Sequence, residues 1–245
     1  MKKLYTLCIV LLVFVAGCSN DSDGSVNNGS DGAGGSTAIF ALVGNYLYSV
    51  DHGDLNVFSL LNASGPVKVN DVNVGFDIET LFSRGNNLYM GSRNGMFMYS
   101  IENPENPKLI SSVSHFTSCD PVVATATHAF VTLHSNTWCG NNTNMLLIYD
   151  MANPKEPELI HSRNLVSPKG LGLYNNYLII CDDEIKIFDI SNPLEPVLKA
   201  SIAQSCNDVI ILGNDLYAVG DRAVYNYALN STNIKDITLK SELSF

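Results

Sequence analysis

The feature that most constrains the fold is a short phrase that recurs along the chain. It consists of an apolar residue, an aromatic, a small or acidic residue and an aliphatic, and a proline-marked turn follows it. Three clear copies begin at Met98, Ile148 and Ile187, a weaker copy begins at Val57, and a degenerate copy begins at Asn226. A second apolar phrase precedes each copy, and its central residues are spaced by 41, 41, 49 and 38 residues. Such a period indicates that each copy is one supersecondary unit of a repeat architecture.

Each unit holds four short runs that are rich in aliphatic and aromatic residues and are separated by Gly, Asn, Asp and Pro. In the fourth unit the runs are residues 170–174, 177–181, 185–190 and 197–202. No segment of the body has a sustained helical period, so we predict an all-β protein. Four antiparallel strands per unit predict a β-propeller of about five four-stranded blades. A β-sandwich is the alternative, but it does not require a recurring proline turn.

The most complete copy of the phrase resembles a known repeat. Residues 186–197, with the sequence KIFDISNPLEPV, resemble the LVIVD repeat of bacterial surface and periplasmic β-propellers. The resemblance extends from about residue 39 to residue 240, although the first copy lacks the first proline and the fifth lacks both. It implies a propeller fold and an exported protein, and it implies no particular activity. We expect the Asn and Pro residues to be structural, because proline fixes φ and ends the third strand.

The start of the chain predicts export and lipid attachment. Lys2 and Lys3 precede an apolar run, residues 7–16, that is too short to cross a bilayer as a helix. The sequence Val-Ala-Gly-Cys that ends at Cys18 resembles the lipobox of bacterial lipoproteins, which implies that Cys18 carries the lipid. An ordinary secreted protein with an incidental cysteine is the alternative. Ser19, rather than an aspartate, follows the cysteine, which implies the outer membrane and leaves the periplasmic and external faces open.

We therefore divide the chain into three parts. Residues 1–17 are the predicted lipoprotein signal peptide, residues 18–37 are the lipidated cysteine and a tether, and residues 38–245 are the propeller. Within residues 19–37, 16 of 19 residues are Ser, Asn, Asp or Gly. Such a composition predicts a flexible tether with a reach of roughly 25 Å. We expect the ring to close by pairing of the strand near Ile39 with the strand near Ile237.

Composition excludes some partners. The chain has 14 Lys and Arg against 24 Asp and Glu, a net charge of −10, and no basic cluster. Nucleic-acid binding requires clustered positive charge, so no nucleic acid is expected. Attachment to a membrane is expected through the lipid alone. We expect the protein to be a monomer.

The four cysteines of the body predict disulfides, as is usual in exported proteins. In a four-stranded blade, the turn between the second and third strands lies on the same rim as the connection to the next blade. All four cysteines fall on that rim, so we expect the pairs Cys119–Cys139 and Cys181–Cys206. A buried free thiol at Cys181 is an alternative. A metal site is disfavoured because no metal-ligand spacing occurs, and no cofactor is expected.

The repeat register also aligns the first residues of the innermost strands, which should meet at the mouth of the central channel. These positions are polar in four of the five units, and Trp138 lies nearby in the long insertion of the third unit. A mouth with convergent polar groups and an aromatic predicts a binding site. The alternatives are that the mouth is polar only because it is wet and that Trp138 packs over a disulfide. The candidate binding residues are Glu79, Asp120, Trp138, Lys169, Asn207 and Asp208.

These features favour a binding or scaffolding module over an enzyme, with a glycan, a peptide or a protein as ligand. The alternative is a carbohydrate-active hydrolase in which Glu79 and Asp120 form an acid and base pair. Lys169 would compete for those charges. No G-x-S-x-G motif occurs, and no histidine falls in register with a serine and an acid. The acidic run at residues 182–184 is expected to be a solvated turn rather than a calcium site.

Overall fold

The alternating pattern of the sequence folds into strands joined by turns. In a computed structural model, residues 35–114, 121–135 and 143–245 are described, and these contain strands but no helix. No helix in this part of the chain is therefore long and apolar enough to cross a membrane. The all-β prediction is confirmed.

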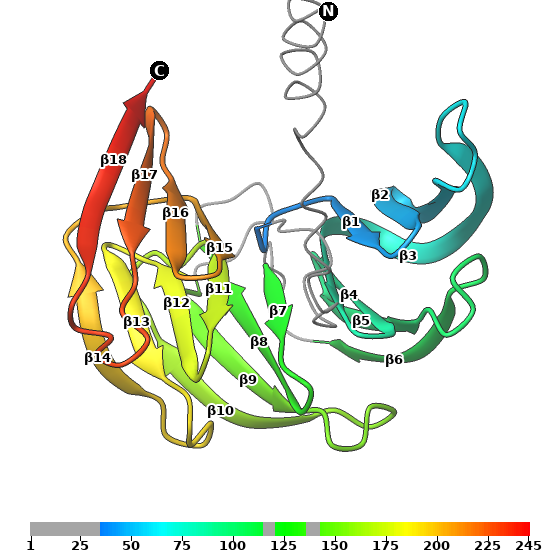
Figure 1. Cartoon of the computed structure of the whole chain (residues 1–245). Helices are drawn as coiled ribbons and strands as arrows, with labels where there is room; N and C mark the ends of the chain where they lie inside the picture. The colour runs from blue at the N-terminus through cyan, green and yellow to red at the C-terminus, as the bar shows by residue number, and fades with distance from the viewer. Residues whose placement is uncertain (1–34, 115–120, 136–142) are drawn as a thin grey trace, which may run out of the picture.

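The strands form four antiparallel sheets, which follow one another along the chain (Figure 1). The first contains β1 (Phe40–Val43), β2 (Tyr46–Ser59), β3 (Val67–Arg84), β4 (Asn87–Ser92), β5 (Gly95–Ser100) and β6 (Lys108–Ser114). The second contains β7 (Val122–Ala124), β8 (His128–Leu133), β9 (Met145–Asp150) and β10 (Glu158–Asn164). The third contains β11 (Leu171–Tyr174), β12 (Tyr177–Cys181), β13 (Ile185–Asp189) and β14 (Val197–Ile202). The fourth contains β15 (Asp208–Leu212), β16 (Asp215–Val219), β17 (Ala223–Ala228) and β18 (Thr238–Ser244).

The first two sequence repeats share the six-stranded sheet. The first part of β2 pairs with β1, and the second part pairs with β3. A hydrogen bond from the Leu60 amide to the Asn45 carbonyl, 2.8 Å long, shows that β2 folds back on itself. The turn in β2 contains His52, whose φ is 48°. Strand β3 in turn pairs with β2 through its first part and with β4 through its second part.

The fourth repeat folds as the sequence predicts, with each expected strand found to within one residue. The expected ring closure is wrong. In the described part of the chain β1 pairs only with β2, and β18 pairs only with β17. The physical reason is that β18 completes the fourth sheet as its outermost strand, which leaves it on the outer edge and far from the inner strand β1 (Figure 1).

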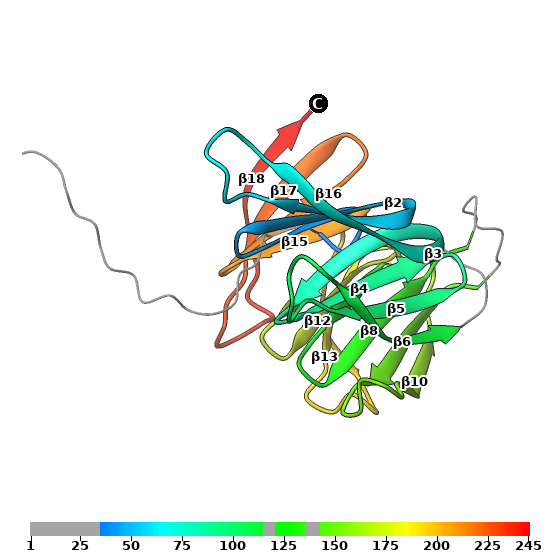
Figure 2. The same cartoon turned by 90° about the vertical axis from the view of Figure 1, so that its right-hand side faces the viewer.

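The inner strands line the centre of the arc that the sheets form. Strand β3 contacts β7, β7 contacts β11, and β11 contacts β15. The side view shows β4, β5 and β6 in front of the second sheet (Figure 2). Strands β6, β10, β14 and β18 are the outer edges of the sheets. The first residues of the inner strands therefore gather on one face of the arc.

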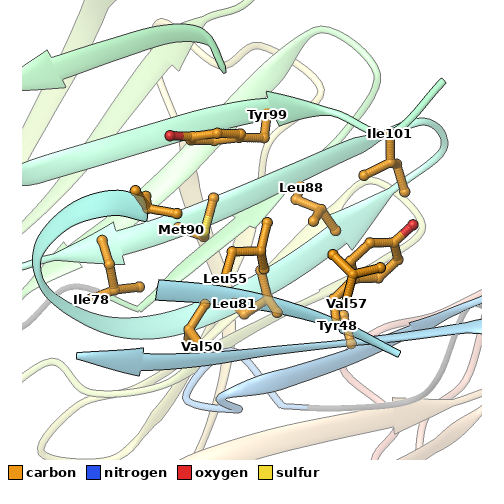
Figure 3. Close-up of a cluster of buried hydrophobic side chains, with 12 residues drawn as sticks. Tyr48, Val50, Leu55, Val57, Ile78, Leu81, Leu88, Met90, Tyr99 and Ile101 are labelled. Atoms are coloured by element: carbon orange, nitrogen blue, oxygen red, sulfur yellow. The ribbon is translucent and has the colours of Figure 1, made fainter. Parts of the chain in front are cut away.

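The core lies between neighbouring repeats, as expected for blades that stack face to face. In the first cluster, Tyr48, Leu55 and Leu88 are fully buried (Figure 3). Similar clusters join the first and second sheets, the second and third, and the third and fourth. Burying one such aliphatic side chain contributes about 1.5–3 kcal/mol to the free energy of folding. The stability of the arc thus comes mainly from contacts between repeats.

The Asn-Pro turns have the structural role that the sequence predicts. In three repeats the amide three residues after the asparagine donates to the asparagine carbonyl, at 3.0 to 3.1 Å from Asn103, Asn153 and Asn192. The side chains of Asn153 and Asn192 also accept hydrogen bonds from the backbone two residues later. The fifth repeat has no proline but makes the same backbone turn at Asn233.

Candidate functional site at the mouth of the arc

The candidate site is the face on which the inner strands begin. Glu79 lies in β3, Lys169 lies just before β11, and Asn207 and Asp208 lie at the start of β15. The repeat register predicts strand starts for these residues, and Lys169, Asn207 and Asp208 lie at or within two residues of one. Glu79 instead lies inside the long strand β3. The other predicted positions fall outside the described residues, namely Cys18, Cys119, Asp120, Trp138 and Cys139.

Lys169 and Asn207 contact each other, which joins the third and fourth sheets across the mouth. Lys169 Nζ donates to Asn207 Oδ1 at 2.7 Å, and Asn207 Nδ2 donates to Asp221 Oδ1 at 2.6 Å. The Lys169 carbonyl accepts from Thr132 Oγ1 of the second sheet at 2.6 Å. The result is a polar chain that runs over three sheets and has a positive and a negative end. Such a chain can receive the hydroxyl and amide groups of a polar ligand.

Glu79 lies in a separate group of charges on the first sheet. Partial burial raises the pKa of Glu79, and the nearby Asp77 raises it further, while Arg93 lowers it. Arg93 Nη1 lies 3.6 Å from Asp77 Oδ2, and the Arg93 amide donates to the Asp77 carbonyl. Asp77 has a φ of 49°, which is uncommon for a residue other than glycine.

Asp208 is buried under the start of the described chain rather than open at the mouth. Ser36 Oγ donates to Asp208 Oδ1 at 3.0 Å. The Thr37 amide and Thr37 Oγ1 donate to Asp208 Oδ2 at 3.1 and 2.6 Å. We call residues 35–38 the N-terminal clasp. The sequence predicts Asp208 as a ligand contact, but its carboxylate is bound by the N-terminal clasp of the same chain.

The acidic run at residues 182–184 differs in part from the expected solvated turn. The Asp182 side chain is fully buried and accepts hydrogen bonds from the amides of Val166 and Ser167. Lys186 Nζ lies 2.7 Å from Asp182 Oδ2 and 2.6 Å from Asp183 Oδ1, so one ammonium group pairs with both carboxylates. Burial lowers the pKa of Lys186, but its bonds to the two aspartates outweigh this and raise the pKa. The solvated description holds only for Asp183, which is half exposed.

Metal binding has no evident donor set in this part of the chain. Among the described residues no group of three or more His, Cys, Asp or Glu side chains is arranged to hold a metal ion.

The disulfide Cys181–Cys206 is confirmed, with an S–S distance of 2.04 Å. It joins the end of β12 to the residues before β15, and both cysteines are buried. The bond therefore fastens the third sheet to the fourth beside the mouth. The expected pair Cys119–Cys139 lies outside the described residues.

Several residues of the mouth carry no signal in the sequence. Ser36 and Thr37 share the composition of the predicted tether and fall within its predicted bounds, yet Ser36 is buried among the inner strands. Asp221 lies in a turn whose proximity to Asn207 becomes evident only from the pairing of β16 with β15 and β17. Arg93 lies in the turn between β4 and β5, as Asp221 lies in the turn between β16 and β17.

Solved structures with the same fold are β-propellers and propeller-like proteins. A Lactobacillus plantarum protein matches with a TM-score of 0.63 and 10% identity, over 81% of this chain and 67% of its own. The Pseudomonas aeruginosa periplasmic gluconolactonase PpgL matches with a TM-score of 0.62 and 12% identity, over 82% and 68%. Kluyveromyces lactis Hsv2p matches with a TM-score of 0.52 and 12% identity, over 82% and 60%. At these identities the likeness concerns the fold, and the chain is an all-β protein of the propeller class.

One repeat of the chain matches a family model. The LVIVD repeat model matches residues 169–204, which contain β11 to β14. The chain therefore carries an LVIVD repeat within a fold of the propeller class. Comparison with curated proteins gives no significant sequence match.

Proposed function

We propose that the protein is an exported, lipid-anchored binding or scaffolding module of the bacterial outer membrane or cell surface. Its proposed ligand is a glycan, a peptide or a protein that contacts the mouth of the arc. The observation that carries the binding role is the polar chain from Lys169 through Asn207 to Asp221, which spans the mouth. Paired groups of this kind position a polar ligand without requiring a reactive centre.

The position of the tether supports the same proposal. The described chain begins at Gly35, at the face that carries the candidate site, and 16 residues separate Gly35 from Cys18. A flexible chain of this length reaches roughly 22 Å. A lipid on Cys18 would thus hold the mouth near the bilayer, and the mouth would sample ligands at the membrane surface.

The anchor predicts a change of location when its cysteine is removed. The variant Cys18→Ser is expected to leave the membrane fraction, because a diacyl or triacyl group binds a bilayer stably and serine at this position would not carry it. Fractionation of cells that express each chain measures this. Ser19→Ala, which keeps the cysteine, is the control and should stay with the membrane. Retention of Cys18→Ser in the membrane fraction would contradict the anchor.

The binding role predicts loss of ligand when the polar chain is broken. We expect Lys169→Met to lower affinity for the ligand at least tenfold, because the ammonium is the only positive end of that chain. The full chain carrying Cys18→Ser would be applied to glycan and peptide arrays with and without this change. Lys155→Met is the matched control, because Lys155 is exposed in a turn on the opposite rim. Equal binding by the two lysine variants would contradict the proposed site.

The same arrays test the hydrolase alternative. A raised pKa at Glu79 is the property that a general acid requires. A hydrolase would release sugar from an array glycan, and Glu79→Gln would abolish the release. A binding module would retain the glycan unchanged. Release that depends on Glu79 would therefore replace the binding proposal with the enzyme.

A further inference from the structure

The N-terminal clasp lies in the centre of the arc, between inner strands that are distant in sequence. In Figure 1 the start of the described chain, in dark blue, lies between β15 and β1 before it runs into β1. Ser36 is 1% exposed, and its hydroxyl accepts a hydrogen bond from the Leu171 amide at 2.7 Å. At the other end, the Ala38 carbonyl accepts from the Leu81 amide of β3 at 2.7 Å. The clasp therefore contacts the first, third and fourth sheets at once.

The contacts of the clasp depend on two particular side chains. Ser36 Oγ is both a donor, to Asp208, and an acceptor, from Leu171. Thr37 donates twice to the same carboxylate, through its amide and its hydroxyl. The Val209 amide adds a further hydrogen bond from β15 itself. Only a hydroxyl residue, serine or threonine, at each of these two positions satisfies the whole set, and the chain supplies Ser36 and Thr37.

The site also fits the residue before the serine. A Cβ atom added to Gly35 would lie 1.9 Å from Asp208 Oδ2, and one added to Gly170 would lie 2.1 Å from Asp208 Oδ1. Both distances are far shorter than any real contact of a Cβ atom. The carboxylate is therefore enclosed between two glycine backbones, one from the clasp and one from the third sheet. This close approach requires glycine directly before the two hydroxyl residues.

The clasp makes these contacts in the way that a bound peptide does. Its backbone turns once, with a hydrogen bond from the Ala38 amide to the Gly35 carbonyl, and adds no strand to the third or fourth sheet. Its partners Asp208 and Leu171 lie more than 130 residues away in sequence.

We propose that the centre of the arc is a binding site for a Gly-Ser-Thr peptide, which the chain fills with its own residues 35–38. Withdrawal of the clasp opens the site, and a separate peptide with the same sequence then occupies it. The Asp208 carboxylate and the Leu171 amide recognise the two hydroxyl residues, and Gly170 provides the space. This inference names a ligand for the binding role proposed above and rests on that role.

A labelled peptide with the sequence of residues 34–39, GGSTAI, tests the site by fluorescence anisotropy. The full chain carrying Cys18→Ser should bind it weakly, because the attached clasp competes at an effective concentration in the millimolar range. Adding Ser36→Ala and Thr37→Val weakens the attached clasp, and we expect binding of the peptide to tighten at least tenfold. A peptide with the sequence GGAVAI should not bind. Equal binding by the two proteins, or of the two peptides, would overturn the proposal.

Asp208 is tested in the same assay. Asp208→Asn in the clasp variant should abolish peptide binding, whereas Asp236→Asn, which removes an exposed charge on the opposite rim, should leave it unchanged. Circular dichroism establishes that each variant is folded. If the clasp variant does not fold, hydrogen exchange of the Thr37 amide in the unaltered clasp replaces it. A millimolar excess of peptide should then speed that exchange severalfold, and unchanged exchange would overturn the proposal.

The peptide experiment and the Lys169→Met experiment can fail independently of each other. Failure of the peptide to bind leaves open whether a glycan depends on Lys169, so it removes the clasp site and not the binding role. Loss of binding by Lys169→Met with normal peptide binding would show two separate sites.

Discussion

Asp182→Ala is expected to lower the free energy of unfolding by about 3 kcal/mol, because three donors lose their acceptor inside the protein. The amides of Val166 and Ser167 would be left without the carboxylate that they now share. Lys186, whose side chain is 16% exposed, would keep only its contact with Asp183. Unfolding in urea, followed by circular dichroism, measures the change as a lower midpoint with an unchanged slope.

Asp183→Ala is the matched control for this prediction. It removes a carboxylate that contacts the same lysine nitrogen at 2.6 Å, but its side chain is 49% exposed. The hydrogen bond with Lys186 lowers the pKa of Asp183, which shows that the contact favours the charged form. Exposed ion pairs contribute less than about 1 kcal/mol. Equal losses in the two variants would contradict the buried role of Asp182.

Replacing both Cys181 and Cys206 by alanine is expected to lower the free energy of unfolding by roughly 3.5 kcal/mol. The bond closes a loop with a sequence separation of 25 residues, and opening it raises the conformational entropy of the unfolded chain. For a protein of this length the loss corresponds to a fall in Tm of about 10 °C. A thermal scan of both proteins by circular dichroism measures it.

Reduction provides the control for the disulfide. Dithiothreitol cannot lower the Tm of the variant through the Cys181–Cys206 bond, because the variant lacks that bond. The unaltered chain should have a lower Tm when it is reduced. A variant that is as stable as the oxidised chain would contradict a stabilising role of the bond.

The sequence predicts those parts of the fold that local patterns determine. In the fourth repeat, Asn, Gly, Pro or acidic residues mark the turns that separate β11, β12, β13 and β14, so the strands are found where they are expected. Within β3, which begins directly after Pro66, no proline interrupts the strand. The chain therefore continues from the first repeat into the second within a single strand. A separate strand at the start of a repeat therefore requires a local turn signal. The border between the first and second repeats lacks one.

The mouth is predictable only where the repeat register applies. Lys169 and Asn207 occupy equivalent positions in consecutive repeats, so the register brings them to one rim, and they contact each other. Ser36 and Thr37 lie outside the register and share the composition of the tether. Their partner Asp208 is more than 170 residues away, and no local pattern contains information about such a contact.

The six-stranded sheet has a consequence for how the arc can bend. A hinge between two blades requires a connection in which no ladder of hydrogen bonds has to break. Strand β3 carries such ladders on both sides of the border between the first and second repeats. These two repeats should therefore move as one rigid body. Any bending of the arc is expected at the borders of the later sheets. The border between the third and fourth sheets is crosslinked by a disulfide, and the N-terminal clasp joins the first sheet to both. Bending at the borders of the second sheet therefore requires release of the clasp.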